Sequence, residues 1–172
     1  MAIFHRYISQ IHGNYRRAYL RSGLLVGALL VLHVVARHLI GRPVASPASY
    51  AGDAIMLVGV VLFMAYYRAS LPEKRITLKE AMLFGMGTAT VAAFVYGVAL
   101  WLTGLLWPGQ TVLFTGTVAG QEVSLQDPQL HYWAAWWGIY AGVLMWVLGG
   151  FGAFLGAIFL RNEKSEIKQH KQ

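Results

Sequence analysis

The sequence contains no cysteine and few charged residues, and both shortages limit what the protein can be. Of its 172 residues, 12% are charged and 57% are hydrophobic, whereas a soluble domain normally carries about 25% charged residues. Without cysteine there is no disulfide framework, thiol nucleophile, thiolate zinc site or cysteine-held iron–sulfur cluster. A chain of this length has more apolar surface than one small core can bury, so lipid is the expected solvent for the rest.

Motifs for enzymatic chemistry are also missing. The sequence has no glycine-rich phosphate loop, no H-E-x-x-H zinc motif and no catalytic-triad spacing. Haem could be held by paired histidines on different helices, but only His33 lies deep in an apolar run. A metal site from His38, His131, Asp53 and Asp127 would have suitable residue types but no motif spacing. We therefore expect no enzymatic activity, no metal and no cofactor.

Long apolar runs dominate the chain. A transmembrane helix needs about 20 mainly apolar residues, and four runs qualify: residues 22–40, 48–67, 78–107 and 132–160. The sequence thus predicts an all-α membrane protein, with residues 1–172 forming a single domain built as a bundle of four transmembrane helices. The loop between the last two runs has β-branched residues on either side of "AGQE", which predicts a short β-hairpin there.

The basic residues are unevenly distributed along the chain. Of the fourteen lysines and arginines, only Arg37 and Arg42 lie at the far end of the first run. All the others precede the first run, separate the second from the third, or follow the fourth. The positive-inside rule then predicts that both termini are cytoplasmic. The net charge of +7 is explained as a topology signal, so nucleic acid is not an expected partner.

The two ends of the chain are basic segments. Residues 1–21 precede the first run and residues 161–172 form a basic tail. One helical face of the first segment would carry Ile3, Phe4, Tyr7, Ile8 and Ile11. This pattern predicts a short helix lying in the membrane interface, and the alternative is a flexible basic tail.

A helix start is well marked before the third run. Thr77 and Glu80 have the T-x-x-E spacing of a capping box. In that motif the threonine oxygen accepts from the first turn while the glutamate accepts from the cap residue's backbone N–H. We expect the third helix to begin at this point.

Small residues recur at four-residue spacing in three of the runs. They are Gly23 and Gly27; Ala93 and Gly97; Gly138 and Gly142; and, toward the end of the fourth run, Gly149, Gly152, Ala153 and Gly156. Small residues allow membrane helices to approach closely. They indicate either packing within one four-helix bundle or an interface with other subunits or a second copy.

The stretch "LHVVARHLIG", residues 32–41, places charge at the end of an apolar run. His33 and Arg37 share a helical face because they are four residues apart, and His38 follows. Asp53 lies at a similar depth in the second run, so we expect Arg37 to pair with it. Asp127 and His131 enter at the same side. The cluster would either staple helix ends together or form a small cavity for an ion, a proton or a polar headgroup.

Two segments resemble an uncharacterised family of bacterial four-helix membrane proteins. They are "EKRITLKEAMLFGMGTATVAAFVYGVALWL" and "WWGIYAGVLMWVLGGFGAFLGAIFLRNEK", and "RITLKEA", residues 75–81, is the nearest match. The resemblance covers about residues 20–164. It implies the four-helix architecture and a bacterial inner membrane, and it implies no chemistry.

Three functions fit these features. The first is a non-catalytic membrane scaffold or accessory subunit, with the lipid bilayer and other membrane subunits or itself as partners. The second is a small oligomeric transporter or channel that uses the charged cluster. The third is an accessory subunit associated with quinone or haem. We favour the scaffold because the third and fourth runs contain no charged residue after Glu80, and a path for charged solutes would normally need one.

Overall fold

The computed structural model describes residues 2–40, 49–72, 75–106 and 130–160. These residues form four helices: α1 (Ala2–Leu39), α2 (Ser49–Ser70), α3 (Leu78–Leu106) and α4 (Leu130–Leu160). The predicted all-helical, four-helix architecture is therefore confirmed. The predicted β-hairpin falls in residues 107–129, which lie outside the described residues.

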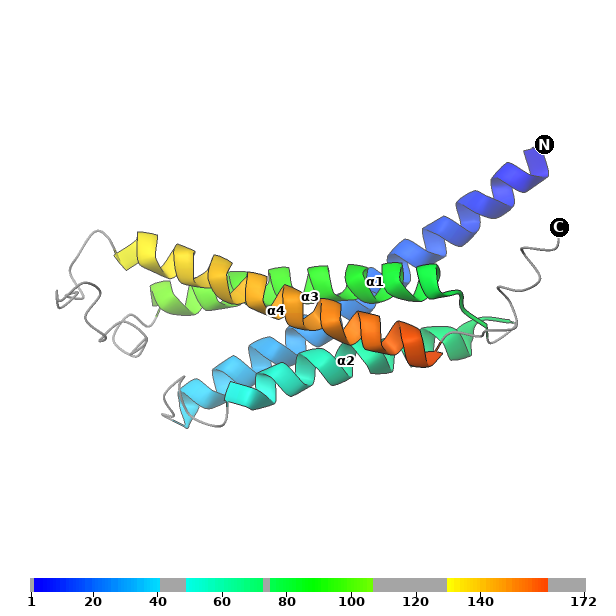
Figure 1. Ribbon diagram of the computed structural model, residues 1–172. Coiled ribbons are helices and arrows are strands. Elements are labelled where there is room, and N and C mark those ends of the chain that lie inside the picture. The colour runs from blue at the N-terminus through cyan, green and yellow to red at the C-terminus, as the bar shows by residue number, and fades with distance from the viewer. Residues whose placement is uncertain (1, 41–48, 73–74, 107–129, 161–172) are drawn as a thin grey trace.

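Helix α1 is longer than the sequence pattern predicted. It begins at Ala2 rather than near residue 22, because no proline precedes Pro43 and a single glycine such as Gly13 costs only about 1 kcal/mol in a helix. At about 1.5 Å per residue, its 38 residues extend about 57 Å, beyond the 40–45 Å of a whole bilayer. Figure 1 shows the N-terminal part projecting past the other helices. Residues 3–11 are thus continuous with α1, and their place in the membrane interface stays a prediction.

The other helix ends lie close to the predicted ones and have local causes. The chain leaves α2 before Pro72, and the Ser70 hydroxyl donates to the Tyr67 carbonyl at 2.7 Å. At the start of α3 the predicted capping box is confirmed. The backbone N–H of Thr77 donates to Glu80 Oε2 at 3.0 Å, and the backbone N–H of Glu80 donates to Thr77 Oγ1 at 3.2 Å.

The four helices run alternately up and down in two crossing layers. Helices α3 and α4 lie side by side in one layer, and α1 and α2 form the other (Figure 1). The largest contact is between α3 and α4, followed by α1 with α3 and α2 with α4. Within the described ranges the backbones of α1 and α4 do not come close to each other. The two layers are therefore joined chiefly by the contact of α1 with α3 and the contact of α2 with α4.

The interior combines a few large side chains with many small ones. Its largest fully buried side chains include Phe84, Leu30, Met56 and Met64. The two methionines of α2 fill space that glycines of α4 leave open. A Cβ atom added at Gly149 would lie 2.5 Å from Met56 Cε, and one at Gly156 would lie 3.0 Å from Met64 Sδ. The flexible thioethers thus fill the gaps between two helices that differ in side-chain size.

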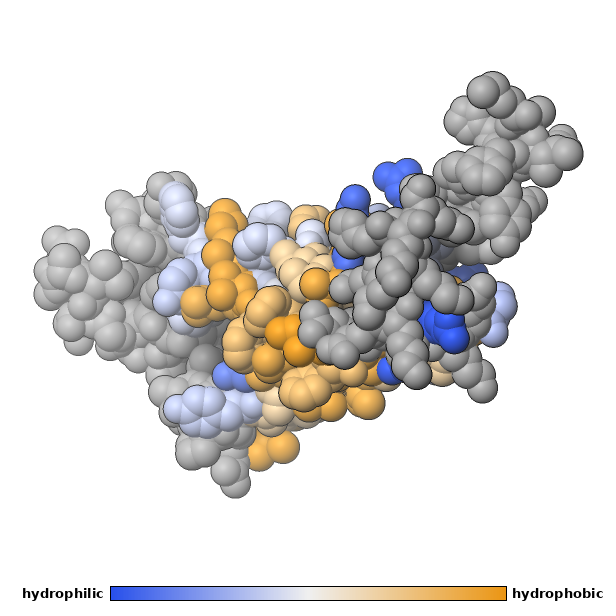
Figure 2. All heavy atoms as spheres, turned by 45° about the vertical axis from the view of Figure 1, so that its right-hand side comes forward, coloured by the Kyte–Doolittle hydropathy of each residue, from blue (hydrophilic) through white to orange (hydrophobic). Residues whose placement is uncertain are grey.

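Large apolar side chains cover much of the outside. Leu24, Phe94 and Phe159 are more than half exposed, and Figure 2 shows an apolar band across the middle of one face, with strongly hydrophilic residues gathered mainly toward one end. All four helices are long and apolar enough to cross a membrane. The chain thus has the architecture of a multi-pass helical membrane protein, in which lipid covers apolar surface that water would not tolerate.

Candidate functional site

The structure describes the side chains of three of the six predicted polar residues. His33 and Arg37 lie on α1, and Asp53 lies near the start of α2. The side chains of His38 and His131, and all of Asp127, lie outside the described residues. The three described side chains are partly buried, so they lie among the helices at the end of the bundle that holds the turn between α1 and α2.

His33 lies against a glycine of the neighbouring helix. A Cβ atom added at Gly52 would be 3.4 Å from His33 Cδ2 and 3.7 Å from Met145 Cε. The imidazole therefore occupies space that a side chain at Gly52 would need. Met145 of α4 lies against the same space. His33 Nε2 is a buried atom. The histidine thus lies in the interior of the bundle and not on its lipid surface.

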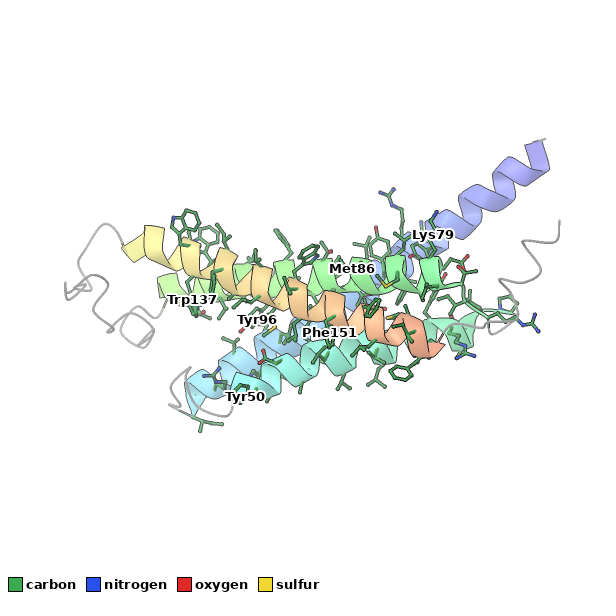
Figure 3. All side chains as sticks on the ribbon, viewed as in Figure 1. Tyr50, Lys79, Met86, Tyr96, Trp137 and Phe151 are labelled. Carbon is green, nitrogen blue, oxygen red and sulfur yellow. The ribbon has the colours of Figure 1, made fainter. Side chains whose placement is uncertain are left out.

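Arg37 and Asp53 both influence a residue that the sequence did not single out. Tyr96 of α3 interacts electrostatically with both of them, and Figure 3 shows Tyr96 on the part of α3 that faces the α1–α2 layer. Arg37 Nε is buried. The opposite charges of α1 and α2 therefore both lie near enough to one phenol of α3 to act on it electrostatically. A direct ion pair between Arg37 and Asp53 stays a prediction.

We call His33, Arg37, Asp53 and Tyr96 the polar cluster. Charged side chains inside a membrane bundle are costly and usually pair with one another. Arg37 and Asp53 have opposite signs, so having both near the same phenol reduces that cost. The cluster offers guanidinium, imidazole and phenol donors beside one carboxylate acceptor, which is enough to bind a small polar group.

Tyr96 could have been found from its position in the sequence. Tyrosines of membrane proteins are enriched at the two interfaces, whereas Tyr96 lies seven residues before Thr103, the end of its candidate span. That places it about 10 Å inside the span, at 1.5 Å per residue. A phenol at such depth needs a polar neighbour, and its neighbours come from two other helices.

The predicted small-residue positions lie at contacts within the chain. Between α3 and α4 the backbones nearly touch: a Cβ atom added at Gly97 would be 2.9 Å from the Gly138 carbonyl oxygen, and one at Gly138 would be 2.7 Å from the Gly97 carbonyl oxygen. One turn away, a Cβ atom at Gly142 would be 3.4 Å from the carbonyl oxygen of Ala93. No side chain fits at Gly97 or Gly138 without moving a helix.

The remaining small residues join the two layers. A Cβ atom at Gly23 would lie 2.5 Å from Val91 Cβ, and one at Gly27 would lie 2.8 Å from Val95 Cβ, so these glycines let α1 approach α3. On α4, Gly149, Gly152 and Gly156 face Met56, Leu57 and Met64 of α2, and Ala153 faces Gly85 of α3. These contacts support packing within one bundle. Every predicted small residue lies at a contact between two helices of this chain.

The close approach of α3 and α4 leaves an apolar groove on their outer side. We call it the α3–α4 groove; it has a volume of about 490 Å³. Ala93, Gly97, Gly138 and Gly142 form part of its lining, and larger walls come from Phe94, Trp101, Val143 and Trp146. Its floor includes helix backbone because Gly97, Gly138 and Gly142 have no side chain.

One hydrogen bond crosses the groove region. Trp146 Nε1 of α4 donates to Thr90 Oγ1 of α3 at 2.9 Å, and that hydroxyl donates in turn to the Met86 carbonyl at 2.8 Å. Hydrogen bonds between membrane helices are worth about 0.6 kcal/mol on average. The bond therefore adds little stability, but it fixes the Trp146 ring as a wall of the groove.

The architecture and these two features define the class of protein: a small multi-pass helical membrane protein with a polar cluster at one end and an apolar groove on one side. Among the described residues, no group of three His, Asp or Glu side chains is arranged to hold a metal ion. No family model, curated protein or solved structure matches the chain. The membership suggested by the resemblance of residues 20–164 therefore stays a prediction.

Proposed function

We propose that the protein is a non-catalytic membrane scaffold or accessory subunit that receives a transmembrane helix of another polypeptide. The observation that carries this proposal is the α3–α4 groove. Its lining residues fall within the candidate spans Leu78–Thr103 and Ala135–Leu160, so whatever fills it is embedded in the membrane. The polypeptide is another subunit or a second copy of this chain.

The shape of the groove favours a helix. Transmembrane helices associate where small residues allow backbones to approach, and Gly97, Gly138 and Gly142 lie in the groove. These glycines already bring α3 and α4 together, so a third helix could pack over the seam between them. The walls of Trp101 and Trp146 would then contact its two sides.

Matched substitutions on α4 test this proposal. Val143 lines the groove, and the next residue, Leu144, does not; the two are 54% and 52% exposed. A photo-crosslinking residue at Val143 should give a discrete protein adduct in membranes, and one at Leu144 should not. Val143→Trp should abolish the adduct formed from a second groove position, Ile139, while Leu144→Trp should leave it. Lipid adducts alone at both positions would refute the scaffold.

We further propose that the protein resides in a bacterial inner membrane with both termini in the cytoplasm. The distribution of lysine and arginine supports this orientation. Because the chain has no cysteine, single-cysteine variants report the topology directly. In intact cells, Gln121→Cys should react with a membrane-impermeant reagent, whereas Lys79→Cys should react only after lysis. The reverse labelling would contradict the orientation.

A second candidate is a small transporter or channel that uses the polar cluster. The partly buried Arg37 and Asp53, whose charges both act on Tyr96, favour it. The fully buried Leu30, Met56 and Val60 fill the adjoining interior, so this conformation would hold a ligand at one end and would not conduct it. Uptake by proteoliposomes that is lost in Asp53→Asn but kept in Val143→Trp would replace the scaffold with this function.

No feature of the described residues specifically favours an association with quinone or haem. His33 is the only histidine whose side chain is described, and its neighbours are Gly52 and Met145. A pair of haem ligands would thus need His38 or His131. An absorption spectrum of protein purified from its own membranes, with a haem band or without one, decides this alternative.

A further inference from the structure

The end of the bundle opposite the polar cluster is held together by aromatic rings. The Tyr67 ring of α2 stacks on the Phe84 ring of α3 with centroids 4.3 Å apart. The Tyr15 ring of α1 meets both edge-on, at 5.8 and 6.0 Å. Its hydroxyl donates to the Glu80 carbonyl at 3.2 Å. These contacts place three helices at one common level.

Basic residues lie at the same end of the bundle, several of them next in sequence to the residues just described. Arg16 follows Tyr15, Arg68 follows Tyr67, and Lys79 precedes Glu80. With Arg17, Arg21 and Arg75 they form a group that we call the basic collar. All of its members except the partly buried Arg68 are exposed. Figure 3 shows Lys79 at this end of the bundle, close to where α1 leaves it.

The collar has little negative charge to balance it among the described residues. Glu80 is the only described acid at this end, and its carboxylate accepts hydrogen bonds from the backbone N–H and the hydroxyl of Thr77. It is therefore engaged in capping α3. The described part of this end is strongly positive and would attract anions at a membrane surface.

Exposed apolar surface begins directly beside the basic side chains. On α1, Arg17, Leu20, Arg21 and Leu24 follow the i, i+3, i+4, i+7 spacing of one helical face, and the two leucines are 43% and 54% exposed. On α3, the 55% exposed Leu83 lies one turn after Lys79. The candidate spans begin or end here, at Tyr15, Ser70 and Leu78. The surface therefore changes from cationic to apolar near these ends of the candidate spans.

We propose that the basic collar binds the headgroups of anionic phospholipids, with their acyl chains lying along Leu20, Leu24 and Leu83. A molecule that combines a phosphate with long apolar chains matches both parts of this surface. A soluble anion would use only the basic part. An acidic soluble protein would likewise leave the leucines, which lie within the spans, unmatched.

The binding strength should follow the number of basic residues retained. Each lysine or arginine near an anionic membrane surface contributes roughly a fivefold increase in affinity. Replacing Arg16, Arg17 and Arg21 together by glutamine should therefore weaken binding by about a hundredfold. The three side chains are exposed, so the packing of the aromatic rings should not change.

The test uses the full-length protein purified in mild detergent, with phosphatidylglycerol or phosphatidylcholine added. Phosphatidylglycerol should raise the thermal unfolding midpoint, and native mass spectrometry should show it bound in preference to phosphatidylcholine. The triple variant R16Q/R17Q/R21Q should lose both effects. The matched control K164Q/K168Q/K171Q, which removes the same charge from the C-terminal tail, should keep them.

Four results would overturn the proposal. These are equal effects of the two lipids, retention of the phosphatidylglycerol effect by R16Q/R17Q/R21Q, equal loss in both triple variants, and equal stabilisation by inorganic phosphate. The third would show an effect of net charge alone, and the fourth a site for free anions. If R16Q/R17Q/R21Q does not fold, the wild-type protein decides: its preference for phosphatidylglycerol should fall steeply with added salt, and a salt-independent preference would contradict the proposal.

Discussion

The two ends of the bundle handle charge in opposite ways. At the basic collar, charged side chains point outward and aromatic rings join the helices, with Phe84 fully buried against Tyr67. At the polar cluster, Arg37 and Asp53 lie partly buried among the helices, and the charges of both act on Tyr96. The first end needs no buried charge to hold three helices together.

The comparison of the two ends shows that helix packing in this bundle does not require internal charges. Aromatic and apolar contacts suffice to close the collar end, so a bundle of this kind can form without internal charges. Charges placed inside the other end cost free energy unless they compensate one another. Their presence there is therefore the feature that packing alone does not explain, and intramembrane charges of this kind are functional candidates by default.

The largest effect should come from the collar end. Phe84→Ala removes a fully buried ring and its stack on Tyr67, and it should lower the free energy of unfolding by about 3 kcal/mol, as large cavities do. The measurement is reversible unfolding in mixed micelles. Phe94→Ala, at a ring that is 72% exposed, is the control and should have little effect. Equal losses would mean that the rings do not hold this end together.

Asp53→Asn should have the next largest effect. It removes the carboxylate that we predict to pair with Arg37 and whose charge, like that of Arg37, acts on Tyr96. Removing one member of a buried pair is strongly destabilising. Because Asp53 is only partly buried, we expect a loss of about 2 kcal/mol. Glu163→Gln removes one negative charge elsewhere and should cost much less. A comparable cost for both would make Asp53 an ordinary surface residue.

The glycine contacts between α3 and α4 should tolerate a methyl group at one position and not at the next. Gly138→Ala would place a Cβ atom 2.7 Å from the Gly97 carbonyl oxygen, whereas Gly142→Ala would meet that of Ala93 at 3.4 Å. We expect Gly138→Ala to cost about 1 kcal/mol despite alanine's better helix propensity, and Gly142→Ala to be neutral or stabilising. Thermal unfolding of the two variants gives the comparison. The opposite order would show that the two helices are not in backbone contact at Gly138.

The capping box at the collar end should give the smallest effect. Thr77→Ala removes the hydroxyl that accepts from the Glu80 backbone N–H, and loss of such a cap costs about 1 kcal/mol. In Thr103→Ala the lost hydroxyl only donates to the Leu100 carbonyl within its own helix, so this control should be nearly silent. If Thr103→Ala costs as much, the cap has no special part in starting α3.

Patterns that depend on neighbouring residues were predictable from the sequence. The four apolar runs gave the helices because lipid imposes a minimum length, and Thr77 and Glu80 marked the start of α3 through a local motif. The start of α1 was missed because the basic segment before residue 22 looks like a boundary, although nothing in it stops a helix. Polarity marks where a span ends, but it does not mark where a helix ends.

Contacts between helices were harder to predict. The sequence indicated that Gly97 and Gly138 pack closely, but not that they face each other. Tyr96 and Tyr15 were missed as partners because their neighbours are distant in the chain. Tyr66, one residue before Tyr67, points outward and is 73% exposed. Only the rotation of each helix about its axis decides which of two adjacent tyrosines enters the interior.

A double-mutant cycle on Arg37 and Asp53 tests most directly whether the polar cluster acts as one unit. The free energy of unfolding would be measured for Arg37→Met, Asp53→Leu and the double variant in the same micelles. Each single variant leaves one charge inside the bundle, and the double variant leaves neither. We predict that the double variant is at least as stable as the worse single variant, with a coupling energy of at least about 1 kcal/mol. Effects that add within about 0.5 kcal/mol would contradict it, because the two charges would then not interact.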